Sequence, residues 1–257
     1  LLDVYQSGDP CTALRPFVLM IHGGGFYVGS KTADIWPDAA NDLTDQGYVA
    51  ISINYRLGGD GPVPSAEFAP VRDGILNSGI GPVITGSTQE QADIIASAIE
   101  DAVTALRWVA DNDDELCVDM SRFAIWGESA GAVIGLHVTY GLDEYSINSP
   151  EPLVLVDYWG RFIFDGLMAP GDAPVMILHG TQDDTVDYSF AQEIRSDAAA
   201  AGIPYSFYTA AGANHSFDEV PVGSVTIDGK TLLQVSYDFI DAHLNNGTPL
   251  YETRIIP

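Results

Sequence analysis

The stretch that decides the fold is Phe123-Ala124-Ile125-Trp126-Gly127-Glu128-Ser129-Ala130-Gly131. Its first four residues are apolar, as in a buried strand, and the helix-like segment AVIGLHVTY follows at 132–140. The pentapeptide GESAG matches G-x-S-x-G, whose glycines permit a tight strand-to-helix turn that lifts the serine hydroxyl clear of a sheet. In this context a plain strand–helix turn is the weaker interpretation. We therefore predict that Ser129 is a nucleophile.

Segments with strand and helix patterns alternate on both sides of this turn. The expected strands are 17–21, 48–55, 122–126, 153–156, 175–178 and 205–209, and the expected helices are 36–45, 91–110, 190–201 and 232–244. Such alternation predicts an α/β fold, with a mostly parallel sheet and helices on both faces. The length of 257 residues suits one domain over 1–257.

One segment does not follow this alternation. Residues 58–87 contain many glycines and prolines and have no sustained period. A long loop in a compact domain is usually functional or mobile. We expect a loop insertion that forms one wall of a binding site, with a plain surface insertion as the alternative.

A glycine-rich loop follows the first predicted buried strand. In HGGGF at 22–26, consecutive glycines allow backbone N–H groups to point into a cavity without interference from a Cβ atom. Such donors stabilise the oxyanion that forms during ester hydrolysis. A phosphate-binding loop is the alternative, but neither G-x-x-x-x-G-K-[ST] nor a helix-opening G-x-G-x-x-G is present.

A serine nucleophile needs a general base, and the base needs an acid that orients it. Of the five histidines, His215 lies on a glycine-bearing loop after the last predicted parallel strand, where its imidazole can reach across the edge of the sheet. Asp183, after the preceding strand, is the expected acid, and Asp184 and Asp157 are the alternatives.

These segments together resemble α/β-hydrolases of the carboxylesterase and esterase/lipase group. The segments that carry the resemblance are HGGGF at 22–26, SINYRLG at 52–58, AVTALRWVADN at 102–112, GESAG at 127–131, HGTQDDTV at 179–186 and NHSF at 214–217. HGGGF with GESAG is similar to type-B carboxylesterases. HGTQDDTV is more similar to smaller esterases and to prolyl-oligopeptidase-type peptidases. The order Ser, Asp, His along the chain is also that of α/β-hydrolases.

The resemblance implies the α/β-hydrolase fold and assigns roles to the candidate residues. Ser129 would be the nucleophile, Asp183 the acid and His215 the base. The oxyanion would rest on the backbone amides of Gly24, Gly25 and Ala130. No cofactor and no metal ion is expected.

The short stretch between the Ser129 turn and His179 leaves no room for a large cap domain. We therefore expect an open cleft. Its candidate substrate contacts are Phe26, Tyr27 and Trp159, whereas Trp108 and Trp126 are expected in the core.

The fold that the resemblance implies also bears on the two cysteines. In its sheet order, the strands at 17–21 and 122–126 are parallel neighbours, and Cys11 and Cys117 precede them by similar distances. Both cysteines would lie at the non-catalytic end of adjacent strands, so a Cys11–Cys117 disulfide is expected, with two free thiols as the alternative. A disulfide would indicate a secreted or periplasmic protein.

The charge balance excludes several classes of partner. Thirty-six acidic and ten basic side chains give a formal net charge of −26, which disfavours binding to nucleic acids and to anionic membrane surfaces. No apolar run approaches the roughly 20 residues of a membrane helix, so membrane insertion is not expected.

We therefore predict a serine carboxylic ester hydrolase that acts through an acyl-enzyme on short-chain or bulky acyl and aryl esters. Its partner would be a small or polymeric ester substrate, and the sequence makes no prediction of oligomeric state. The alternatives are an aminopeptidase-like serine peptidase of the same fold and a non-enzymatic binding protein that has this fold.

Overall fold

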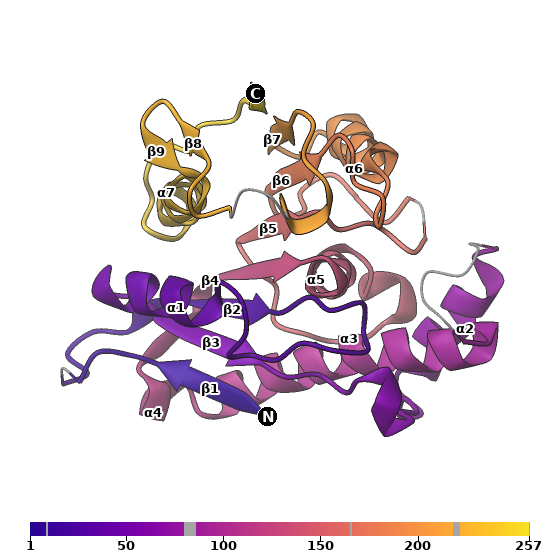
Figure 1. The fold of residues 1–257 in the computed structure, drawn as a ribbon. Coiled ribbons are helices and arrows are strands. Elements are labelled where there is room, and N and C mark those ends of the chain that lie inside the picture. The colour runs from indigo at the N-terminus through magenta and orange to yellow at the C-terminus, as the bar shows by residue number, and fades with distance from the viewer. Residues whose placement is uncertain (9, 80–85, 165, 218–221, 257) are drawn as a thin grey trace.

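An eight-stranded sheet forms the centre of the computed structural model, which describes residues 1–8, 10–79, 86–164, 166–217 and 222–256 (Figure 1). The strand order is β1-β3-β2-β4-β5-β6-β7-β10, and all neighbours are parallel except β1, which is antiparallel to β3. The strands are β1 (Leu2–Tyr5), β2 (Arg15–Ile21), β3 (Val49–Ile53), β4 (Val118–Glu128), β5 (Val154–Tyr158), β6 (Val175–Gly180), β7 (Tyr205–Ala210) and β10 (Thr253–Ile256). A two-stranded ribbon pairs β8 (Thr226–Ile227) with β9 (Lys230–Thr231).

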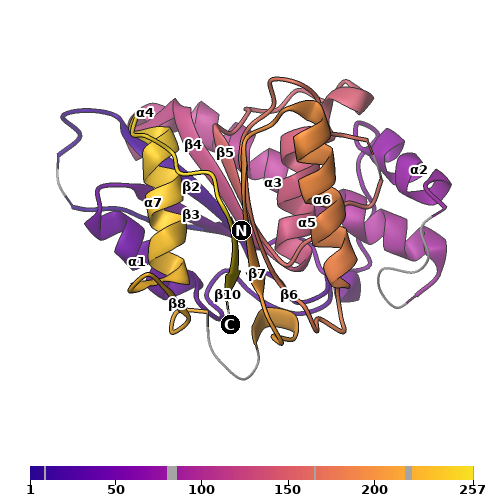
Figure 2. The same ribbon diagram turned by 90° about the horizontal axis from the view of Figure 1, so that it is seen from above.

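Helices cover both faces of the sheet, with α1 and α7 on one face and α3, α5 and α6 on the other (Figure 2). The helices are α1 (Trp36–Asp45), α2 (Ala69–Asn77), α3 (Thr88–Asp111), α4 (Asp113–Leu116), α5 (Ala130–Tyr140), α6 (Tyr188–Ala201) and α7 (Leu232–Leu244). Strand β2 shows why both faces need cover. Its Val18 and Met20 pack in one core with α1 and α7, while Leu19 and Ile21 pack in the other. The predicted α/β architecture is confirmed.

The predicted strands correspond to β2 through β7, because buried parallel strands are continuous apolar runs that are visible in a sequence. The two edge strands, β1 and β10, were not predicted. Each has only four residues, and most of these are partly or fully exposed. Short half-exposed strands have no apolar run, so the sequence contains no strong signal for them.

The predicted loop at 58–87 is wrong in part, because it contains α2 and the short 3₁₀ helix η1 (Gly58–Asp60). Helix α2 buries only Val71 and Ile75, four residues apart, so it is too short to show a sustained period. The helix includes Gly74, where a Cβ atom would overlap the Tyr145 hydroxyl. Residues 80–85 of the predicted loop lie outside the described residues.

The longest helix, α3, begins at an N-cap in which the Ser87 side chain accepts a hydrogen bond from the Glu90 amide. Trp108 on this helix is 42% exposed, so its predicted place in the core is wrong, whereas Trp126 on β4 is fully buried as predicted. Trp108 lies next to the apolar stripe that contains Leu106 and Val109, and not within it. Among the described residues, no helix is both long and apolar enough to cross a membrane.

Cys11 and Cys117 form a disulfide with a Cα–Cα distance of 5.7 Å. Cys117 immediately precedes β4, and its carbonyl accepts a hydrogen bond of 2.9 Å from the Arg15 amide at the start of β2. The disulfide therefore lies where β2 and β4 begin. Ser129 lies at the opposite end of β4, so the disulfide is remote from it.

Candidate active site

Ser129 occupies the turn between β4 and α5 in a sparsely populated backbone conformation, with φ 50° and ψ −118°. A conformation of this kind costs about 1–3 kcal/mol and persists only where the surroundings impose it. Here the close packing of neighbouring backbone atoms imposes this conformation. A Cβ atom at Gly131 would overlap the Ile21 carbonyl oxygen, and one at Gly127 would overlap the Gly131 backbone. The two glycines of the pentapeptide are therefore required by sterics.

Hydrogen bonds link Ser129 to two side chains that follow other strands, first to His215 and through it to Asp183. His215 begins the 3₁₀ helix η3 (His215–Phe217) after β7, and its Nε2 lies 2.9 Å from Ser129 Oγ. Its Nδ1 lies 2.7 Å from Oδ2 of Asp183, which follows β6. Because parallel strands end at the same edge of the sheet, residues far apart in the chain form one hydrogen-bonded row.

The structure describes all three candidate acids, and of these Asp183 is the one that hydrogen bonds to His215. Asp184 is exposed, and its backbone amide donates to Asn214 Oδ1. Asp157 is fully buried at the end of β5, where its Oδ1 accepts a hydrogen bond of 3.0 Å from the Gly160 amide.

Asp183 is held rigidly and ionised. Its Oδ1 accepts hydrogen bonds from the amides of Thr185 (2.9 Å) and Val186 (2.8 Å). Its Oδ2 also lies 3.2 Å from His179 Nε2. Burial would raise the pKa of Asp183, but the hydrogen bonds from His179, His215 and Val186 outweigh this effect and hold the pKa well below its usual range.

The remaining histidines have structural contacts. In each, a ring nitrogen lies within 2.7 Å of a backbone carbonyl oxygen: His22 at Gly23, His137 at Val133, His179 at Val186 and His243 at Phe239. Burial lowers the pKa of His137 to about 4, so this ring is neutral and its Nε2 accepts from the Ile163 amide. Among the described residues, no cluster of three or more His, Cys, Asp or Glu side chains could hold a metal ion.

The predicted oxyanion loop lies against Ser129. A Cβ atom at Gly23 would lie 3.2 Å from the Cβ atom of Ser129. Gly24 and Gly25 have φ of 100° and 58°, and a Cβ atom at Gly24 would overlap the Val28 carbonyl. Within the described part of the chain, the amides of Gly24, Gly25 and Ala130 make no hydrogen bond, so they are available as donors.

The three predicted substrate contacts differ in exposure. Phe26 is 1% exposed and Trp159 is 2% exposed, so they offer a substrate almost no surface. The Trp159 ring instead lies edge-on to the His215 ring, with 6.2 Å between the centroids, and also packs against Phe217. Tyr27 is only half-buried and stays a predicted contact.

Sequence reasoning missed the contact that Glu128, next to Ser129, makes with the glycine loop. Its Oε1 accepts a hydrogen bond of 3.3 Å from the Gly23 amide, and so connects the serine turn to the oxyanion loop. Burial and the nearby Asp34 raise the pKa of Glu128 to about 7. A signal was present in the sequence, since Glu128 is the charged residue in a pentapeptide of otherwise small residues.

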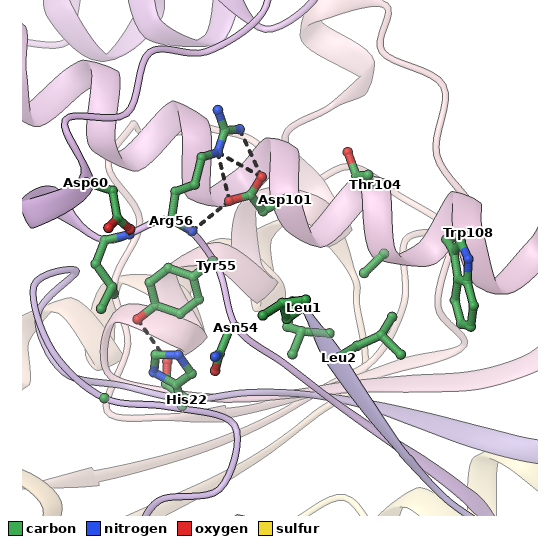
Figure 3. Close-up of a pocket in the computed structure, with 14 residues that line it drawn as sticks. Leu1, Leu2, His22, Asn54, Tyr55, Arg56, Asp60, Asp101, Thr104 and Trp108 are labelled. Carbon is green, nitrogen blue, oxygen red and sulfur yellow. Dashed lines mark hydrogen bonds and ion pairs between the residues drawn. The ribbon is translucent and has the colours of Figure 1, made fainter.

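A cavity of about 640 Å³ lies behind the oxyanion loop, between β1, the end of β3 and α3 (Figure 3). His22 and Tyr55 line it on the side of the loop, and Trp108 lines it along α3. None of Ser129, Asp183 or His215 lines it. Of the described residues in the predicted insertion, Asp60 of η1 lines this cavity.

The chain has the α/β-hydrolase fold, and comparisons with known proteins agree. A family model described as "alpha/beta hydrolase fold" matches residues 94–162, and one described as "BD-FAE" matches residues 2–75. Each model matches under a third of the chain, and the similar proteins described next are esterases and lipases.

Two fungal lipases are similar to part of the chain. Secreted triacylglycerol lipase LIP1 of Gibberella zeae is 32% identical over 132 residues, which cover 50% of this chain and 19% of the lipase. Secreted lipase 1 of Botryotinia fuckeliana is 30% identical over 129 residues, which cover 49% and 19%. The similar region thus spans about a fifth of the length of these relatives.

Solved esterase structures share the fold over nearly the whole chain. Esterase 2 of Thermogutta terrifontis with bound propionate has a TM-score of 0.70 at 20% identity, over 97% of this chain and 91% of that one. A truncated carbohydrate esterase from gut microbiota has a TM-score of 0.67 at 16% identity, over 95% and 90%. At these identities the likeness shows the fold alone.

Proposed function

We propose that this protein hydrolyses carboxylic esters through an acyl-enzyme, with Ser129 as nucleophile, His215 as base and Asp183 as acid. One observation supports this above all. His215 lies within hydrogen-bond distance of both partners, 2.9 Å from Ser129 Oγ and 2.7 Å from Asp183 Oδ2. That row is the geometry that serine hydrolases of unrelated folds share.

The hydrogen bond to Asp183 selects the useful tautomer of His215. With the proton on Nδ1 donated to the carboxylate, the lone pair of Nε2 faces the Ser129 hydroxyl. His215 can therefore take the serine proton as Oγ attacks the ester carbonyl carbon. The ionised Asp183 then stabilises the imidazolium that results.

The rest of the cycle uses the backbone amides next to Ser129. As the carbonyl oxygen becomes an oxyanion, it would accept hydrogen bonds from the amides of Gly24, Gly25 and Ala130. The His215 imidazolium then gives its proton to the alcohol, which leaves, and Ser129 remains acylated. Water attacks the acyl-enzyme by the same route and releases the acid.

We infer that the substrates are esters with short or bulky acyl groups. Between α5 and β6 the described residues contain only β5 and the short 3₁₀ helix η2 (Asp143–Tyr145), so no cap domain is built there. The similar Thermogutta esterase has been solved with propionate and with butyrate, which are both short acids. Tyr27, which is half-buried next to the glycine loop, is the proposed wall for the substrate.

Export from the cytoplasm is part of the same proposal. A disulfide between Cys11 and Cys117 is stable in an oxidising compartment, and both fungal relatives are called secreted lipases. The net charge of −26 fits a protein whose substrates are neither nucleic acids nor anionic lipids.

The test is hydrolysis of p-nitrophenyl acetate, butyrate and octanoate by the wild type and by Ser129→Ala, beside an aminoacyl p-nitroanilide. We expect turnover of the shorter esters that Ser129→Ala abolishes. Faster cleavage of the anilide would indicate a peptidase instead. No turnover of any substrate by a folded wild type would favour a binding protein.

A further inference from the structure

Tyr55 has no role in the mechanism above, yet it touches the oxyanion loop directly. It follows β3 and is 4% exposed. Its hydroxyl donates to the carbonyl oxygens of Gly23 (2.9 Å) and His22 (3.1 Å), and Figure 3 shows the hydroxyl turned toward His22. Gly23 O also lies 2.7 Å from His22 Nδ1, which donates to it. Two donors therefore hold one carbonyl group.

The Gly23 carbonyl belongs to the same peptide group as the Gly24 amide. A peptide group is planar, and in the trans form its C=O and N–H point in opposite directions. The described residues contain no cis peptide bond. When Tyr55 and His22 hold the carbonyl from the cavity side, the Gly24 N–H is fixed on the opposite side. Donation to the carbonyl also polarises the peptide group, which strengthens its N–H as a donor.

The preceding peptide group, between His22 and Gly23, is held by Glu128. The Gly23 amide donates to Glu128 Oε1 at 3.3 Å, and a Cβ atom at Gly23 would lie 3.2 Å from the Ser129 Cβ atom. Gly23 is thus fixed at both of its peptide groups. The loop has little freedom to rotate the Gly24 N–H away from the serine.

We propose that Tyr55 is a positioning residue that aims the Gly24 N–H at the oxyanion. The inference rests on the proposed ester hydrolysis and assigns a part of its machinery that touches no reacting atom. Replacing the hydroxyl should weaken transition-state stabilisation while leaving ground-state binding of the ester unchanged.

The Tyr55 ring is well fixed for such a role. It stacks on the His22 ring, with centroids 4.4 Å apart and planes 18° apart, and meets Phe26 edge-on at 6.1 Å. Burial and the nearby Glu128 raise the pKa of Tyr55 well above its usual range, so the hydroxyl keeps its proton. The packing also explains why Phe26 is buried.

The matched test compares Tyr55→Phe with Tyr48→Phe. Tyr48 lies at the other end of β3, is 1% exposed, and donates to Asp241 Oδ1 at 2.7 Å. Each substitution removes one buried hydroxyl, but only Tyr55 touches the loop. The measurements are kcat and KM for p-nitrophenyl butyrate, the melting temperature, and Ki for an alkyl trifluoromethyl ketone, whose adduct with serine carries an oxyanion.

We expect Tyr55→Phe to lower kcat about tenfold, less than the 10²–10³-fold typical of deleting an oxyanion donor outright. KM should stay within about twofold, and Ki for the ketone should rise in proportion to the loss of kcat/KM. Tyr48→Phe should change the melting temperature and leave kcat and Ki as in the wild type.

The reference is wild-type turnover that vanishes in Ser129→Ala. Against it, a Tyr55→Phe enzyme with wild-type kcat and Ki overturns the role of Tyr55 and leaves the proposed function standing. Equal losses of kcat in both tyrosine variants, in step with melting temperature, also overturn it, because they indicate general destabilisation. Absence of wild-type ester turnover overturns the proposed function and this inference together.

Discussion

At the scale of single residues, two adjacent aspartates have different surroundings. Asp183 points inward to His215 and accepts from the Thr185 and Val186 amides, whereas the next residue, Asp184, is exposed. The sequence favoured Asp183 but left Asp184 open. The choice depends on the turn after β6, and adjacent positions in a turn have no distinguishing pattern.

The pair offers a matched test of the acid. Asp183→Asn keeps the shape but favours the wrong tautomer of His215, so kcat should fall by up to about 10⁴-fold, as in other serine hydrolases. Asp184→Asn should leave kcat within about twofold. The measurement is kcat for p-nitrophenyl butyrate at constant pH. The reverse order of effects would assign the acid to Asp184.

A second residue-scale prediction concerns Asp157 and pH. Burial raises the pKa of Asp157 from 3.8 to about 7. Between these values the folded chain keeps a proton that the unfolded chain has lost, so the free energy of unfolding falls as pH rises through this window. At about 1.4 kcal/mol for each pKa unit, the loss is roughly 4 kcal/mol at most. Glu128, whose pKa burial raises to about 7, adds to it.

Asp157→Asn cannot ionise and should flatten this dependence. Urea denaturation at several pH values from 4.5 to 8 measures it, with Asp184→Asn as the exposed control. We expect the stability of the variant relative to the wild type to increase as pH rises. A difference that stays constant across the window would show that Asp157 does not titrate there.

At the scale of elements, the close approach of α5 to the end of β2 fixes the serine turn. A Cβ atom at Gly131 would overlap the Ile21 carbonyl, whereas one at Gly135, also on α5, would lie 3.0 Å from the tip of the Leu155 side chain. A backbone atom cannot yield as a flexible side chain can. The two glycines of one helix therefore differ in how well they tolerate alanine.

We expect Gly131→Ala to lower the free energy of unfolding by several kcal/mol, or to prevent folding, since overpacking against rigid atoms costs about 1–3 kcal/mol or more. Gly135→Ala should change it by about 1 kcal/mol or less, because alanine favours helix. Melting temperature and soluble yield report the difference. Equal tolerance of both substitutions would contradict the close packing.

The elements also differ in how well the sequence predicts them. Strands β2 through β7 and the long helices were predictable, because buried strands and amphipathic helices have strong periodic signals. Strands β1 and β10 and helix α2 were not, since their few buried residues form no pattern. The residues of the proposed triad follow from motifs at strand ends. The contact of Tyr55 with Gly23 joins residues 32 positions apart and depends on the loop conformation, which no local pattern encodes.

At the scale of the whole molecule, the sheet places the proposed catalytic residues at one end of its strands and the disulfide at the other. Ser129, Asp183 and His215 come from the ends of β4, β6 and β7, while the Cys11–Cys117 disulfide lies where β2 and β4 begin. The strained serine turn is held by β2, β4 and β5, whose residues near the turn are buried.

The measurement that tests the central claim most directly is covalent labelling with paraoxon, followed by peptide mass spectrometry. A serine activated by His215 displaces p-nitrophenol and keeps the diethylphosphoryl group. We predict one adduct per chain, on Ser129, with ester hydrolysis lost in step with labelling and no adduct in His215→Ala. Labelling of another residue, or full activity after Ser129 is labelled, would contradict the account.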